Sequence, residues 1–248
     1  MRFWIGTSGF QYPEWKGGFY PADLPVAKML GYYSERFSTT EVNYTFRQIP
    51  KETTVAKWVA GTPEEFRFTF KAPQKVTHFA KLRNCGDTMR HFHHIMTGLG
   101  EKRGAVLLQL PPNVEKDTEV LADFLVELPQ EMRAAFEFRH ESWFDGEVYA
   151  LLEKHNAALC LAESAELATP RKVTADFGYL RLRREDYTDA DLGDWAAFVK
   201  KQKKHWGEVY VYFKHEEKGV GPVFAEKFKG MVQEVLQMSS KDMRRSRP

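Results

Sequence analysis

Stretches in which apolar and polar residues alternate recur along the chain, and between them lie longer stretches with an apolar residue every three or four positions. The first pattern is typical of β-strands and the second of helices, because side chains repeat with these periods in the two structures. Eight strands are predicted, at residues 3–7, 40–46, 66–72, 105–110, 134–139, 158–162, 179–183 and 208–214. An amphipathic stretch follows most of them, and this order favours a parallel sheet.

Eight strand–helix units within 248 residues predict an α/β fold, a single TIM-type (β/α)8 barrel. A doubly wound open sheet is the alternative. The helix after the sixth strand is expected to be missing or irregular, since residues 164–176 show no helical period. We expect one barrel domain over residues 1–238, and then a basic, frayed tail over 239–248 that carries Lys241, Arg244, Arg245 and Arg247.

Several helix starts are marked by side chains that can cap free backbone amides. Asp87 and Asp117 each precede an amphipathic stretch, and Thr188 and Asp191 have the spacing of a capping box. The remaining predicted helices cover residues 26–37, 51–60 and 147–155, and a last one carries Phe224, Phe228 and Val232.

The fifth predicted strand carries charges on one face only. Within residues 134–139, Phe136 and Phe138 fall on one side and Glu137 and Arg139 on the other. We predict that the two charges are neighbours facing the barrel interior at the carboxyl end of the strand, with Trp143 just beyond. The phenylalanines should face outward under the helices, because a slip of one residue would reverse every side chain.

Polar residues also lie at the carboxyl ends of the other strands, where barrel enzymes hold their active sites. We therefore expect a ligand site there. The candidate catalytic residues are Glu137, Glu41 and Lys71. The candidate substrate-binding residues are Ser8, Asn43, Gln109, Arg139, His140, Trp143, Arg181 and Tyr212.

The charges at these strand ends nearly cancel, because three carboxylates meet three cations: Glu41, Glu137 and Glu163 against Lys71, Arg139 and Arg181. Cations among the carboxylates disfavour a divalent metal, although His78, His140 and His215 could still be ligands. We expect no metal and no cofactor. A glutamate beside an arginine or lysine stays ionised and can act as a base, while the cation is held for an anionic ligand.

Composition and motifs exclude several classes of protein. The net charge of +2 gives no strong field toward nucleic acid or a membrane, and no apolar run reaches the ~18 residues of a membrane span. The chain has no nucleophile elbow, phosphate-binding lysine loop or dinucleotide fingerprint. Two cysteines without metal-like spacing, Cys85 and Cys160, and a strand that begins near the first residue lead us to expect a cytoplasmic protein without a signal peptide.

A set of short motifs, in this order, spans nearly the whole chain: Ile5-Gly-Thr-Ser-Gly9, Glu41-Val-Asn43, Lys71-Ala-Pro73, Leu108-Gln-Leu-Pro-Pro112, Glu137-Phe-Arg-His-Glu-Ser-Trp143, Tyr179-Leu-Arg181 and Tyr210-Val-Tyr-Phe213. In this combination the chain resembles domain of unknown function 72, the family of YecE-like proteins. The resemblance implies a barrel of the triosephosphate-isomerase type and assigns no reaction.

The chain departs from that family's pattern at two places. Arg183-Arg184 stands where such proteins usually have His-Gly, and Lys214-His215 stands where they usually have two asparagines. Both changes add positive charge at the barrel mouth, which indicates a ligand that is more anionic than that of typical members.

Three functions are consistent with the sequence. The first is an enzyme, a hydrolase, lyase or isomerase, that acts on a small polar or anionic molecule at the strand ends. The second is a protein that binds single-stranded nucleic acid, through the rings of Tyr12, Trp15, Phe46 and Trp143 beside Arg139, Arg181, Arg183 and Arg184. The third is a scaffold whose mouth holds an inert network of ion pairs. No membrane partner is expected.

Overall fold

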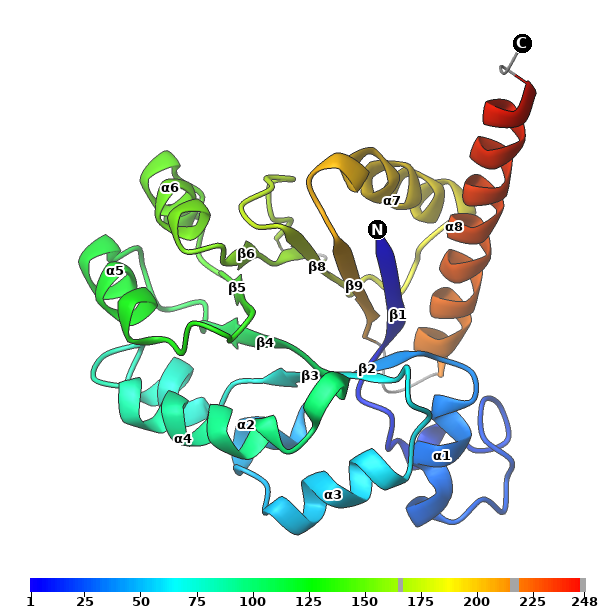
Figure 1. The fold of residues 1–248 in the computed structure, drawn as a ribbon, viewed down its shortest axis with the longest axis horizontal. Helices are drawn as coiled ribbons and strands as arrows, with labels where there is room; N and C mark the ends of the chain where they lie inside the picture. The colour runs from blue at the N-terminus through cyan, green and yellow to red at the C-terminus, as the bar shows by residue number, and fades with distance from the viewer. Residues whose placement is uncertain (165–166, 215–218, 246–248) are drawn as a thin grey trace.

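Nine parallel strands form one sheet, which curls into a nearly closed barrel with the helices outside it (Figure 1). The computed structural model of the protein describes residues 1–164, 167–214 and 219–245, and their side chains except those of 234–245. From one edge to the other the strand order is β6-β5-β4-β3-β2-β1-β9-β8-β7. The strands are β1 Arg2–Ser8, β2 Thr39–Val42, β3 Arg67–Lys71, β4 Arg103–Gln109, β5 Ala134–Glu137, β6 Ala158–Leu159, β7 Leu161–Glu163, β8 Phe177–Leu182 and β9 Glu208–Phe213.

The sixth predicted strand is present in two halves, β6 and β7, which Cys160 separates. β6 pairs with β5, and β7 pairs with β8, so this one strand position bridges the two edges of the sheet. The eight strand positions of a (β/α)8 barrel are thus all occupied. The described residues between β7 and β8, 164 and 167–176, form no helix, as predicted.

The helices are α1 Met29–Ser34, α2 Tyr44–Arg47, α3 Glu52–Ala60, α4 Gly86–Thr97, α5 Thr118–Glu127, α6 Gly146–Lys154, α7 Asp189–Lys201 and α8 Val220–Arg245. Two of the predicted caps are confirmed. The Asp117 carboxylate accepts a hydrogen bond from the Val120 amide, and Thr188 and Asp191 form a capping box. The Asp87 cap is wrong, because the Gly86 amide donates instead to Glu127 of α5 and leaves Asp87 in the first turn.

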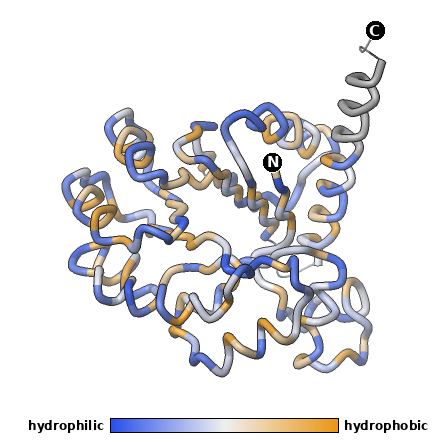
Figure 2. Tube along the Cα trace, in the orientation of Figure 1, coloured by the Kyte–Doolittle hydropathy of each residue, from blue (hydrophilic) through white to orange (hydrophobic). Residues whose placement is uncertain are grey.

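Apolar residues fill two separate regions on either side of the sheet, and hydrophobic and hydrophilic residues are interleaved along the strands (Figure 2). The outer region lies between sheet and helices and includes Phe136, which packs edge-on against Phe124 of α5. The inner region fills the barrel, and its rings are Trp4, Phe177, Tyr179, Tyr210 and Tyr212. The barrel is therefore packed through most of its length, and only its ends are open to chemistry.

The second strand differs from the expectation. β2 ends at Val42 rather than at residue 46, because Asn43 takes helical backbone angles and α2 follows. The Thr45 hydroxyl donates to the carbonyls of Val42 and Lys71, and these bonds compete with a strand ladder. At the other end of the chain, α8 continues to Arg245, into the segment where the sequence favours a frayed tail (Figure 1).

Candidate active site at the carboxyl ends of the strands

Strand β5 presents its side chains as the alternation predicts. Glu137 is fully buried toward the barrel interior, and Arg139 lies just past the strand with its Nε 3.2 Å from Glu137 Oε1. Phe136 and Phe138 both belong to the outer apolar region. Phe138 stacks on Trp143, with ring centroids 4.5 Å apart. This contact holds the turn after β5 against the outer side of the strand.

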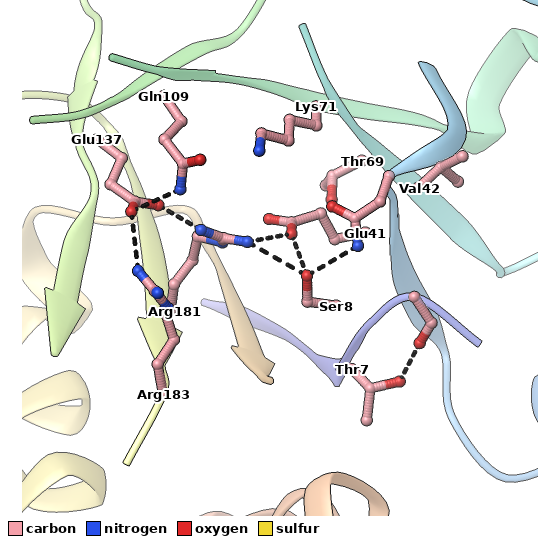
Figure 3. A network of polar contacts seen from close by, with 12 residues as sticks. Thr7, Ser8, Glu41, Val42, Thr69, Lys71, Gln109, Glu137, Arg181 and Arg183 are labelled. Carbon is pink, nitrogen blue, oxygen red and sulfur yellow. Dashed lines mark hydrogen bonds and ion pairs between the residues drawn. The ribbon is translucent and has the colours of Figure 1, made fainter. Parts of the chain in front are cut away.

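The Glu137 carboxylate is the acceptor for four side chains, of which Gln109, Arg181 and Arg183 are labelled in Figure 3. Oε1 accepts from Gln109 at 2.7 Å, from Arg139 at 3.2 Å and from Arg183 at 3.4 Å. Oε2 accepts from Arg181 at 2.5 Å. Three arginines from the ends of two strands therefore converge on one buried carboxylate.

A second buried carboxylate, Glu41 at the end of β2, shares Arg181 with Glu137 (Figure 3). Arg181 donates to Glu41 Oε1 at 2.9 Å and to the Ser8 hydroxyl at 3.2 Å. Ser8 in turn donates to Glu41 and accepts from the Asn43 amide at 3.1 Å. Tyr179 donates to the other oxygen of Glu41 at 2.7 Å, so the polar network rests on the rings that fill the barrel.

The environment of Glu137 fixes its charge. Burial alone would raise its pKa, but Arg181, Arg139 and Arg183 together lower the pKa to about 2. A carboxylate this acidic, with both oxygens occupied, is a weak base at neutral pH. Its position indicates that it holds the arginines in place, and the geometry gives no support to the expectation that it transfers a proton.

Lys71, at the end of β3, is a cation of the mouth that does not bond to either buried carboxylate. Among the described residues, no hydrogen bond or ion pair reaches its amine; Nζ lies over the ring of Phe46, 3.9 Å from the centroid. Burial, and then the neighbouring Arg181, lower the pKa of Lys71 to about 8. An amine with this pKa is neutral in part of the molecules at physiological pH and can accept a proton or act as a nucleophile.

His78 lies against the same ring as Lys71. Its imidazole meets Phe46 edge-on, with centroids 4.8 Å apart, and its Nδ1 is hydrogen bonded to the Thr77 hydroxyl at 2.9 Å. Burial lowers the pKa of His78, and the charges of Lys71 and Arg139 lower it further. His78 was not among the predicted binding or catalytic residues, although its place seven residues after Lys71 in the β3–α4 connection could have indicated a residue of the mouth.

The charge balance at the mouth differs from the prediction. Glu163 faces outward and accepts hydrogen bonds from Tyr187 and from Trp195 of α7, at 3.0 and 2.8 Å. Arg183 faces inward beside Glu137, whereas Arg184 faces outward and pairs with Glu163. Within the described part of the chain, two carboxylates, Glu41 and Glu137, are therefore surrounded by four cations: Lys71, Arg139, Arg181 and Arg183.

A pocket of about 270 Å³ opens beside this network. Glu137, Arg139 and Arg183 line it together with Ser164 and Thr169. The side chains of Arg139 and Arg183 are 31% and 22% exposed, whereas that of Arg181 is 2% exposed. Arg139 and Arg183 can therefore contact a ligand, and Arg181 serves as an internal bridge.

Two of the predicted binding residues are buried, and a third is half-buried. Trp143 is buried in the outer apolar region, where its indole donates to the Val114 carbonyl. Tyr212 is buried inside the barrel and hydrogen bonded to Thr39 at 2.7 Å. His140 is half-buried, and its Nδ1 is engaged by Ser142.

Two of the four rings that motivated a nucleic-acid surface are buried, whereas Tyr12 and Phe46 are partly exposed. Trp15 and Trp143 are 2% and 1% exposed, so neither can stack on a base. Of the arginines in that hypothesis, Arg181 is buried, and Arg184 pairs with carboxylates on the outer side.

Among residues 1–164, 167–214 and 219–245, no group of three or more histidine, cysteine or carboxylate side chains could hold a metal ion. The candidate ligand His215 lies outside the described residues. Within the same described ranges, no helix has the length and apolar character required to cross a bilayer.

The family model described as "Protein of unknown function DUF72" matches residues 4–247. The chain belongs to the DUF72 family. The resemblance carried by the short sequence motifs is thereby confirmed. In this member, the motif residues Ser8, Glu41 and Glu137 meet in one network with Arg181 (Figure 3).

Two DUF72-type relatives are similar in sequence. The chain is 32% identical over 142 residues to UPF0759 protein YecE of Escherichia coli K12, and 29% identical over 154 residues to UPF0759 protein YunF of Bacillus subtilis 168. These alignments cover 57% and 59% of this chain and 50% and 54% of the relatives. The chain thus matches about half the length of these curated relatives.

Solved structures of the family share the barrel. A DUF72 family protein from Thermotoga maritima superimposes with a TM-score of 0.81 at 26% identity, over 94% of this chain and 100% of that one. A DUF72 family protein from Enterococcus faecalis gives 0.78 at 17% identity, over 93% and 95% of the two chains, and shows the fold alone. The predicted α/β barrel is therefore confirmed.

Proposed function

We propose that this protein is an enzyme that binds a small anionic substrate at the carboxyl mouth of the barrel. Arg139 and Arg183 hold the anion, and the amine of Lys71 carries out the proton transfer or nucleophilic attack. Glu41, Glu137 and Arg181 form a rigid network that holds these groups in position. Because both cysteines are free and buried, we place the protein in a reducing compartment, the cytoplasm.

The excess of positive charge is the observation that carries this proposal. Among the described residues, two carboxylates face four cations, and Lys71 has no ion pair or hydrogen bond. Holding like charges together destabilises a folded protein unless something neutralises them. A bound anion would supply the missing negative charge, and the pocket beside Arg139 and Arg183 offers it a place.

Lys71 is better suited than Glu137 to the chemistry. Its pKa of about 8 lies close to neutral pH, where a group can both gain and lose a proton, whereas the pKa of Glu137 is about 2. Proton transfer next to a carbonyl or phosphoryl group, with arginines to stabilise the negative charge that develops, fits lyase and isomerase chemistry. Hydrolysis by a water that Lys71 deprotonates is the third arrangement these groups allow.

Thermal unfolding in the presence of small anions tests the proposal. A panel of carboxylates and phosphate monoesters should contain members that stabilise the protein, since a ligand at 100 times its Kd adds about 2.7 kcal/mol. Arg183→Leu should lose most of this stabilisation. Arg184→Leu is the matched control, because Arg184 is the next residue but faces away from the pocket.

Two results would contradict the proposal. If no anion in the panel stabilises the wild type at low ionic strength, the mouth is an inert network, and the scaffold interpretation holds. If Arg183→Leu and Arg184→Leu weaken anion binding equally, the effect reflects general surface charge and not this pocket.

A further inference from the structure

We propose that the substrate is a small anionic aldehyde or ketone, and that the Lys71 amine forms an imine with its carbonyl carbon. This inference rests on the proposed function, because the same mouth must first bind the anionic end of the molecule. It goes further by naming the reacting group of the substrate and the covalent bond.

The backbone holds Lys71 in a fixed place. It is the last residue of β3, and its carbonyl accepts a hydrogen bond from the Thr45 hydroxyl at 2.7 Å. The amide of the next residue, Ala72, donates to the Leu107 carbonyl of β4 at 2.8 Å. The side chain therefore starts from a rigid strand end, which favours a reacting group more than a mobile loop would.

The amine itself is held by contacts that leave its lone pair available. Nζ lies over the Phe46 ring, and among the described residues no carboxylate accepts a hydrogen bond from it. An ammonium locked into an ion pair would keep its proton and could not attack a carbonyl. Here burial and the charge of Arg181 lower the pKa of Lys71 to about 8, two conditions that activate amine nucleophiles.

His78 supplies the proton carrier that imine formation needs. Its Nδ1 is taken by Thr77, whereas among the described residues no hydrogen bond reaches Nε2. Since the rings of His78 and Phe46 are in contact, and Lys71 lies on Phe46, the imidazole and the amine are neighbours across one aromatic ring. Because its pKa is lowered, His78 is largely neutral near pH 7 and ready to take up a proton.

The covalent step balances without any further reactant. The Lys71 lone pair forms a C–N bond to the carbonyl carbon, and the π electrons of the carbonyl move to its oxygen, which takes a proton. In the second step the nitrogen forms the C=N bond and the hydroxyl leaves with another proton as water. The amine gives up two protons and the departing oxygen receives two, with His78 carrying them between the two atoms. No atom is oxidised or reduced.

The arginines of the pocket select an anionic carbonyl compound over a neutral one. Arg139 and Arg183 are the partly exposed cations that line the pocket, and each can form two parallel hydrogen bonds to a carboxylate or phosphate. Lys71 does not line this pocket, and Figure 3 shows it on the other side of Arg181 from Arg183, so the anchored molecule must extend its carbonyl across the mouth to reach the amine.

Borohydride trapping tests the imine directly. The full-length protein is incubated with glyoxylate, pyruvate or glycolaldehyde phosphate, and sodium borohydride then reduces any imine to a stable secondary amine. Mass spectrometry of the intact chain and of its peptides should find one adduct per chain, on Lys71, with at least one of the three compounds. Lys71→Arg keeps the positive charge and should lose this adduct. Lys75→Arg, at an exposed lysine of the same connection, should label like the wild type.

A rate measurement tests the part assigned to His78. His78→Gln should form the Lys71 adduct at least tenfold more slowly while melting near the wild-type temperature. Equal trapping rates in His78→Gln and the wild type would remove His78 from the proposal.

Carbonyl-free analogues separate this inference from the proposed function. Glycolate, lactate and ethyl phosphate carry the same anions without a reactive carbonyl. If they stabilise the protein but no adduct forms on Lys71, the imine is wrong and the anion site stands. If none of them stabilises it and no adduct forms, both proposals fall. Labelling of Lys71 that does not exceed that of Lys75 also overturns the imine, because it would show only the general reactivity of surface amines.

Discussion

Each end of the barrel holds a carboxylate that accepts several hydrogen bonds, buried at the carboxyl end and half-buried at the amino end, and the two are surrounded differently. At the amino end, Glu208 accepts hydrogen bonds from Trp4, Tyr210 and Arg133, and Trp4 and Tyr210 are stacked. At the carboxyl end, Glu137 is met by three arginines and a glutamine and has no aromatic donor among the residues that the structure describes. Aromatic rings thus close the barrel at the amino end, whereas arginines and carboxylates cluster at the carboxyl end.

This difference separates a carboxylate held by two aromatic donors and one arginine from a carboxylate that three arginines surround. Glu208 has indole and phenol donors beside Arg133, so one cation is enough to balance its charge. Three arginines on Glu137 exceed what one carboxylate can neutralise, and Lys71 adds a fourth positive charge. An arrangement of this kind lowers stability in the free protein and raises affinity for an anion.

The largest expected effect comes from removing the charge that holds the arginines. Glu137→Gln keeps the shape of the side chain but leaves Arg139, Arg181 and Arg183 with Glu41 as the one described carboxylate of their network. We expect a loss of about 3 kcal/mol in the free energy of unfolding at pH 7, the scale found when one partner of a buried ion pair is removed. Urea unfolding followed by fluorescence measures it.

Glu208→Gln is the matched variant at the amino end. Its side chain is 17% exposed, and the ring donors remain, so we expect a loss of about 1 kcal/mol or less. Equal losses at the two ends would remove the distinction between them.

The same comparison can be sharpened by pH. The pKa of Glu137 is about 2 in the folded protein, whereas a glutamate without these interactions has a pKa of 4.5. The folded state therefore favours the ionised form. The stability this adds is complete above pH 4.5 and is lost as the pH falls toward 2; it amounts to about 3 kcal/mol at 1.36 kcal/mol per pH unit. The difference in unfolding free energy between wild type and Glu137→Gln should therefore shrink between pH 5 and pH 2. A difference that stays constant over this range would show that Glu137 is not the carboxylate whose ionisation the arginines favour.

Sequence reasoning could predict the strand positions and much of the network, because the alternation of apolar and polar residues is strict where both faces of a strand are buried. It placed Glu137 and Arg139 inward and Phe136 and Phe138 outward, as the structure has them. The same rule, applied one strand further, would have placed Glu163 outward, since it shares a face with Leu159 and Leu161.

The remaining differences depend on contacts between distant segments. Nothing in the local pattern of residues 40–46 shows that Thr45 bonds to the carbonyl of Lys71, which ends β2 early and brings Phe46 under the amine. Trp143 is buried because it stacks on Phe138 and its indole donates to the carbonyl of Val114, which lies 29 residues earlier in the chain. Periodicity predicts the face on which a residue lies; it does not predict which neighbour will cover it.

The smallest expected effect has the opposite sign. The pKa of Lys71 is about 8 in the folded protein against 10.5 for a free side chain, so the unfolded chain binds the proton more tightly. Below pH 8 the charged amine therefore lowers the stability of the fold, and this penalty disappears as the pH rises from 8 to 10.5. Lys71→Met keeps the apolar contact with Phe46 and removes the charge. After allowance for partial exposure, we expect it to be more stable than the wild type by about 1 kcal/mol at pH 7, and by much less at pH 10. Lys75→Met, at an exposed position, should change little at either pH. Urea unfolding at the two pH values measures the stability of all three proteins. A Lys71→Met variant that is less stable than the wild type at pH 7 would show that the amine is paired in solution. The charges at the carboxyl end would then be neutralised as fully as those at the amino end.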